Sequence, residues 1–157
     1  ETDPGPRQNR GAVVIKLIIP GQPVPWSRPR HGGGKHFNKA EHARALNRVN
    51  WEARLAMRAL APLDGPERVS ARIVFAPPKT WSKKLKASCI GSPVMVKPDL
   101  SNLLKLVEDG CQGQIYVDDK QIVAFGFIEK IYGEQPRTEF YVERYEALKA
   151  HRVVAAE

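Results

Sequence analysis

Residues 97–123, KPDLSNLLKLVEDGCQGQIYVDDKQIV, contain the patterns that decide the fold. Between Asp99 and Asp109 the apolar side chains recur at spacings that place them on one face of a helix, at about 100° per residue. These side chains are Leu100, Leu103, Leu104, Leu106 and Val107. Gly110 and Gly113 are expected to end the helix, and the strongly apolar segment Gln121–Ile131 is typical of a strand. The stretch therefore predicts a helix followed by a strand.

The rest of the chain adds further elements of both kinds. Alternating or β-branched segments predict strands at Ala12–Ile19, Arg68–Ala76 and Thr138–Tyr145, and a pattern of period 3.6 predicts a helix over Ala40–Leu60 that Pro62 stops. Residues Gly133–Pro136 are expected to form a hairpin turn. Together these elements predict one α+β domain, a small mixed sheet packed against two main helices, over residues 12–146. Residues 1–11 are expected to be a disordered leader, and residues 147–157 a C-terminal tail.

Charge is distributed unevenly along the chain. The formal net charge is +8, but residues 1–97 carry 18 basic and 6 acidic side chains, whereas residues 98–157 carry 7 and 11. Basic side chains at this density are typical of a protein that binds a polyanion, because each neutralised phosphate releases condensed counterions. Two acid-free segments, Pro20–Asn38 and Pro77–Lys97, and the first predicted helix hold the candidate DNA contacts: Arg28, Arg30, Lys35, Arg44, Arg48, Lys79, Lys83, Lys84, Lys86 and Lys97.

Composition excludes two classes of protein. No apolar run approaches the roughly 20 residues that a membrane-spanning helix needs. The cysteines, Cys89 and Cys111, form no C-x-x-C pair, so neither a disulfide scaffold nor a zinc site is expected. The polar, acidic start has no apolar core of a signal peptide, and a cytoplasmic location is therefore expected.

An acidic set on the second predicted helix and after it is the most informative feature. Asp99 lies at the helix start, Asp118 and Asp119 follow a tight turn, and Lys105 lies between them. Carboxylate oxygens are ligands that Mg²⁺ prefers, and a lysine beside them can stabilise charge that develops at a phosphate. A purely structural interpretation is equally compatible with the spacing: Asp99 caps the helix, Lys105 pairs with Asp109, and the two aspartates form a turn.

The motif itself adds a family resemblance. Residues 97–105 (KPDLSNLLK) and 116–123 (YVDDKQIV) resemble the P-D-x-D-N-L-x-K helix and the D-D-x-Q-I/V strand of the RusA family of Holliday-junction resolvases. Residues 20–25 (PGQPVP) with 28–30 (RPR), and residues 78–84 (PKTWSKK), are also similar to members of that family. The blocks occur in the same order, and the resemblance covers roughly residues 15–145.

The resemblance implies an activity and a site. It implies a Mg²⁺-dependent homodimeric endonuclease, with Mn²⁺ as the alternative ion, that nicks opposed strands of a four-way DNA junction. The implied catalytic residues are Asp99, Lys105, Asp118 and Asp119. Of the paired acids, Asp119 takes the essential ligand position and Asp118 a supporting one.

One residue departs from the family pattern. Ser101 stands where the family has the second motif aspartate, so the implied metal site, Asp99, Ser101, Asp118 and Asp119, lacks one negative charge. Three explanations follow: the site works with Asp99, Asp119 and water, with Glu108 as a further ligand; Ser101 is an engineered substitution; or the protein binds junctions without cutting them. A non-catalytic DNA-binding module, in which Trp26 and Trp81 stack on unpaired bases, is the rival function. A nuclease that cuts DNA flaps or replication forks is the third candidate function.

Overall fold

The computed structural model describes residues 13–28 and 39–146. The predicted leader and tail, together with Arg30 and Lys35 of the first basic segment, lie outside these ranges. The strands are β1 (Val14–Pro20), β2 (Glu67–Phe75), β3 (Ile122–Tyr132) and β4 (Arg137–Arg144). The helices are α1 (Lys39–Met57), α2 (Lys83–Cys89) and α3 (Leu100–Cys111), and a 3₁₀ turn lies at Asp119–Gln121. The predicted α+β class is confirmed, and each predicted strand is found within two residues of its expected bounds.

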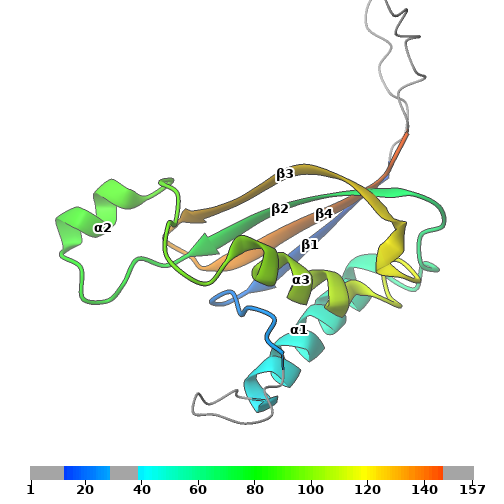
Figure 1. Ribbon diagram of the computed structural model, residues 1–157, viewed down its shortest axis with the longest axis horizontal. Helices are drawn as coiled ribbons and strands as arrows, with labels where there is room; N and C mark the ends of the chain where they lie inside the picture. Colours follow the sequence, from blue (N-terminus) through cyan, green and yellow to red (C-terminus); the bar gives the residue numbers. More distant parts are fainter. Residues whose placement is uncertain (1–12, 29–38, 147–157) are drawn as a thin grey trace, which may run out of the picture.

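The strands form one mixed sheet in the order β1-β4-β2-β3. β4 runs antiparallel to both of its neighbours, and β2 runs parallel to β3. Helices α1 and α3 lie on the same face of this sheet (Figure 1). The core between them is built from side chains that are almost fully buried, including Leu17, Val49, Leu103 and Phe140. The buried face of α3 is the one that the leucine spacing predicted.

The segment between β3 and β4 is not the hairpin turn that the sequence suggested. β2 lies between these two strands in the sheet, so residues 133–136 cross the end of β2. The Gly133 N–H donates to the Phe75 carbonyl over 2.9 Å. A Cβ at position 133 would lie only 2.4 Å from Val74 Cγ1, so the crossing requires glycine. The prediction failed because turn residues mark a reversal of the chain and do not show which strand it pairs with.

Two predicted helix ends were also wrong. Helix α1 ends at Met57, before Leu60 and Pro62, because Arg58 and Ala59 adopt left-handed backbone angles with φ of 47° and 66°. Leu60, the last residue of the predicted helix, lies outside α1 and is 61% exposed. Helix α3 continues through Gly110, where a Cβ would lie 2.5 Å from Val49 Cγ1. Gly110 is therefore a contact point between α3 and α1 and does not end the helix.

Residues 77–98, which we call the arm, contain the short helix α2 that the sequence analysis assigned to a basic loop. Ser82 caps this helix, since its Oγ accepts from the Leu85 N–H over 3.2 Å. The arm has its own small apolar cluster of Cys89, Val94 and Tyr132, against which Trp81 packs. Figure 1 shows α2 beyond the end of the sheet, away from α1 and α3.

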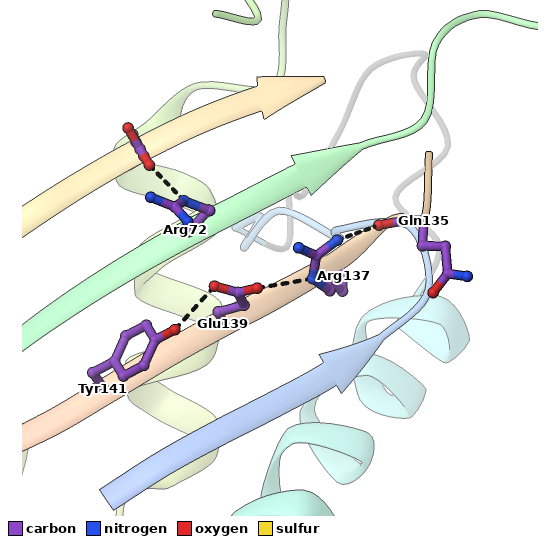
Figure 2. Close-up of polar contacts among 6 residues, drawn as sticks. Arg72, Gln135, Arg137, Glu139 and Tyr141 are labelled. Atoms are coloured by element: carbon purple, nitrogen blue, oxygen red, sulfur yellow. Dashed lines mark hydrogen bonds and ion pairs between the residues drawn. The ribbon is translucent and has the colours of Figure 1, made fainter. Parts of the chain in front are cut away.

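The other face of the sheet carries a polar network along β4 (Figure 2). Glu139 is only 9% exposed, and burial acts to raise the pKa of its carboxyl. Hydrogen bonds from Arg137 Nε (2.9 Å) and Tyr141 Oη (3.0 Å) outweigh that effect and hold this pKa below its usual range. Nearby, Arg72 pairs with Glu129 over 2.6 Å. Glu139 is thus a satisfied structural carboxylate, and the candidate site lies elsewhere.

Candidate functional site

Helix α3 presents the motif residues from its start. Asp99 is its N-cap residue: the Asp99 backbone carbonyl accepts from the N–H groups of Asn102 (3.1 Å) and Leu103 (3.2 Å). Its side chain makes no capping hydrogen bond, although a cap was one interpretation of this residue. Both Asp99 and Ser101, in the first turn, are exposed. The Asp99 carboxylate is therefore accessible to a cation or to a phosphate-bound metal.

Strand β3 holds the backbone that leads into Asp99. The Lys130 ammonium donates to the carbonyl oxygens of Val96 over 2.7 Å and of Pro98 over 2.9 Å. A charged donor makes such hydrogen bonds stronger than neutral ones. Lys130 therefore fixes the approach to the motif, and nothing in the local sequence around Asp99 indicated this contact.

Lys105 lies in the middle of α3, and its ammonium contacts two partners. Its ammonium is 3.7 Å from Asp109 Oδ1, which confirms the ion pair that the spacing predicted. The same ammonium lies 5.0 Å from the centre of the Trp26 ring. The backbone N–H of Trp26 donates to the Asn102 carbonyl over 2.9 Å, so the segment after β1 is attached to α3 at this point. Trp26 is thus packed against protein, and its contact with Lys105 was not predicted.

Glu108 lies near the other end of α3, where it is partly buried close to other charged side chains. Its pKa is raised to about 7, first by burial and then by the charges of Asp119 and Asp109, while Lys105 acts in the opposite direction. The Tyr116 hydroxyl donates to the Glu108 carbonyl over 2.8 Å and fixes the following turn against the helix. Asp119 therefore lies close enough to Glu108 for their charges to interact.

The paired aspartates have different local roles. Asp118 caps the 3₁₀ turn: its Oδ1 accepts from the Lys120 N–H over 2.9 Å, and this bond is the main cause of a lowered pKa for its carboxyl. Gln121 completes the cap, because its Oε1 accepts from the Asp118 N–H over 3.1 Å. The Gln121 amide also donates to the carbonyls of Leu63 (3.0 Å) and Gly65 (3.1 Å). Asp118 and Gln121 thus hold the turn that presents Asp119.

The predicted site residues are therefore distributed along α3. Asp119 is brought together with Glu108 and Asp109, and Lys105 pairs with Asp109. Asp99 and Ser101 lie at the start of α3, and the helix rise separates Asp99 from Glu108 by about 13 Å along its axis. In residues 13–28 and 39–146, no three His, Cys, Asp or Glu side chains converge as ligands for one ion.

The described DNA-contact candidates lie in separate regions. Arg44 and Arg48 are exposed on α1, where Arg48 pairs with Glu52 over 3.1 Å. On the arm, the Lys86 ammonium donates to the Lys79 carbonyl. The candidates Arg28, Lys79, Lys83, Lys84 and Lys97 are all exposed. Trp81 packs on Tyr132, with ring centres 5.4 Å apart, so both candidate stacking tryptophans contact protein.

A mixed sheet covered on one face by two helices, with the acidic and lysine motif on α3, defines a RusA-like α+β protein. The family model described as Endodeoxyribonuclease RusA matches residues 20–143. The chain belongs to this family, as the sequence motifs indicated. It is also similar to the uncharacterized protein YqaN of Bacillus subtilis (strain 168), with 29% identity over 140 residues, 85% of this chain and 98% of YqaN. No helix in the described part of the chain has the length and apolar character that crossing a membrane requires.

Proposed function

We propose that the protein is a metal-dependent endodeoxyribonuclease that resolves four-way (Holliday) DNA junctions by paired, symmetric nicks. The family match over residues 20–143 carries this proposal. Its support in the structure is the exposure of Asp99 and the position of Lys105 on the same helix. Two symmetric cuts require two sites, and we propose a homodimer for that reason.

The acidic residues suit a hard divalent cation such as Mg²⁺, or Mn²⁺ in its place. Asp99 and Asp119 would supply carboxylate ligands, with Asp118 in support and the Ser101 hydroxyl as a weak, uncharged donor. Burial is the main cause of the raised pKa of Glu108, and the charges of Asp119 and Asp109 add to it; a bound cation would offset that part of the effect. Magnesium commonly binds through one or two carboxylates plus waters and substrate phosphate oxygens. When bound, it activates water and neutralises charge at the phosphorus.

The chain's own residues orient and stabilise the reacting phosphate. Lys105 would place its ammonium where negative charge develops in the transition state. Contacts with Asp109 and with the Trp26 ring restrict this side chain. Basic side chains would contact the DNA phosphates: the arm lysines, the α1 arginines and Arg28. Such contacts position DNA without reading its sequence. The expected products carry 5′-phosphate and 3′-hydroxyl ends.

The proposal is tested by cleavage of an end-labelled four-way junction beside a linear duplex, in Mg²⁺ and in EDTA. The proteins compared are the chain itself, Ser101→Asp, Asp99→Asn and Asp119→Asn, with Asp64→Asn as a matched control at an exposed aspartate outside the motif. We expect paired nicks in Mg²⁺ that disappear in both motif Asp→Asn variants, while junction binding survives. Asp64→Asn should nick normally.

Other outcomes separate the alternatives. Nicks only from Ser101→Asp would identify a resolvase that has lost activity at this position but retains its DNA contacts. Absence of nicking by both the chain and Ser101→Asp, with salt-sensitive binding that does not respond to Mg²⁺, would contradict the enzyme and support a binding module. If flap or fork substrates are cut faster than the junction, the protein is a nuclease specific for those structures.

A further inference from the structure

The arm ends in an exposed apolar pair directly before the acidic motif. Met95 is 90% exposed and Val96 is 63% exposed, and Asp99 follows three residues after Val96. A single exposed apolar residue needs no explanation, because most protein surfaces contain some. Two adjacent ones at the C-terminal end of the arm form an exposed apolar pair, which we call the tip.

The tip is held firmly although it is exposed. Residues 91–94 run beside β3, where three backbone hydrogen bonds of 2.8–3.0 Å join them to Lys130 and Tyr132. Val94, immediately before the tip, is buried in the small cluster of the arm. On the other side, the Lys130 ammonium binds the Val96 and Pro98 carbonyls. The backbone on both sides of the tip is thus fixed to the same strand.

The arm that carries the tip is basic. Residues 77–98 contain five lysines and no acidic residue. In the described part of the chain none of these lysines forms an ion pair, so their charges are not neutralised by the protein. This charge favours a polyanion over an acid-poor protein surface or a second copy of the same basic arm.

We propose that Met95 and Val96 form a wedge that inserts at a base step of branched DNA, next to the phosphate that a metal ion bound by Asp99 would hold. This inference rests on the proposed function. Apolar wedges, methionine among them, are known to enter between base steps and partly unstack them. Stacking is already interrupted at a branch point, so insertion there costs less than in a continuous duplex. The wedge would therefore favour junctions over linear DNA.

Chain geometry places the wedge within reach of the cut. The four residue-to-residue steps from Met95 to Asp99 span at most about 14 Å when extended. Successive bases on one strand are about 3.4 Å apart. The wedge thus acts within about four base steps of the phosphate at Asp99, and it couples recognition of the branch point to the position of cleavage.

The test uses the full chain and a four-way junction with 2-aminopurine beside the branch point, in EDTA so that no cleavage occurs. The variant Met95→Ala/Val96→Ala removes the wedge. The variant Leu85→Ala/Ile90→Ala is the matched control, since these apolar residues of the arm are 45% and 41% exposed and are not part of the tip. Circular dichroism melting confirms that both variants fold.

We expect the wild-type chain to raise 2-aminopurine fluorescence by unstacking the base. The wedge variant should lose this rise and bind the junction about tenfold more weakly, with unchanged affinity for linear duplex. The control variant should behave as wild type. An undiminished fluorescence rise and an unchanged junction-to-duplex affinity ratio in the wedge variant would overturn the proposal. Loss of self-association without a change in the DNA response would also overturn it and would assign the tip to a protein contact.

The same proteins distinguish failure of the wedge from failure of the nuclease. If Mg²⁺ produces no nicks but the fluorescence and affinity differences hold, the wedge stands and the catalytic proposal falls. If the wedge variant nicks junctions with wild-type rate and preference, the catalytic proposal stands and the wedge falls. A wild-type chain that binds neither DNA substrate overturns both.

Discussion

Removal of the aromatic ring beside Lys105 should slow the chemical step of DNA cleavage. The Lys105 ammonium lies 5.0 Å from the Trp26 ring centre, and the lysine side chain is 44% exposed. A cation–π contact at this exposure is worth about 1 kcal/mol, which corresponds to roughly a fivefold change in rate if it is used to orient the ammonium. We therefore expect Trp26→Leu to nick a junction about fivefold more slowly, and Trp26→Phe to lose less because it retains a ring face.

The assay is single-turnover nicking with protein in excess, so that the rate reports chemistry and not binding. Trp51→Leu is the matched control, since Trp51 is 55% exposed on α1. Trp26 also packs against the main core, and a melting curve must show that the variants are folded at the assay temperature. A rate for Trp26→Leu equal to that of wild type would refute the reasoning. Equal losses in the Leu and Phe variants would assign the effect to packing instead of the ring face.

Three further predictions concern the stability of the fold. Burial raises the pKa of Glu67 to about 7, so between pH 4.5 and pH 7 the folded protein retains a proton that the unfolded chain has released. The free energy of unfolding should therefore fall by up to about 3 kcal/mol as the pH rises from 4.5 to 7. Urea denaturation should show a smaller fall for Glu67→Gln. Ala59→Gly should raise the free energy of unfolding by about 0.5–1 kcal/mol, because Ala59 has a φ of 66°, and an unchanged urea midpoint would contradict this. Gly133→Ala should lower it by about 1–3 kcal/mol through the clash with Val74, measured as a lower thermal midpoint.

The parts of the fold that depend on local patterns were predictable from the sequence. The leucine spacing in α3 correctly gave its buried face, since helix periodicity and burial are local properties. The end of α1 was not predictable in the same way, because two residues without a glycine adopt left-handed angles there. The position of β4 between β1 and β2 was also missed. Strand pairing is a long-range property, and the turn sequence at Gly133–Pro136 does not contain it.

In the candidate site, too, the local features were predictable from the sequence and the long-range contacts were not. Asp99, Lys105 and Asp119 stand in two nearby motif blocks, residues 97–105 and 116–123, and the i,i+4 pair of Lys105 with Asp109 follows from helix geometry alone. The contacts that hold these residues come from distant segments of the chain. Trp26 reaches Lys105 from 79 positions away, and Gln121 attaches its turn to backbone 58 positions away. Only the packed fold brings such groups together.

Ser101 changes the charge of α3 more than its shape. It is exposed in the first helical turn, where the helix dipole favours an acidic side chain by about 0.3–1 kcal/mol. Helix stability alone would therefore favour the aspartate that the family motif has at this position. The serine instead leaves Asp99 as the acidic side chain beside the exposed Lys97 and the lysines of the arm, so the approach to α3 is more positive. Ser101→Asp should accordingly stabilise the protein whether or not it increases nicking. For this reason the melting temperature and the cleavage rate of that variant report separately on the helix and on the site.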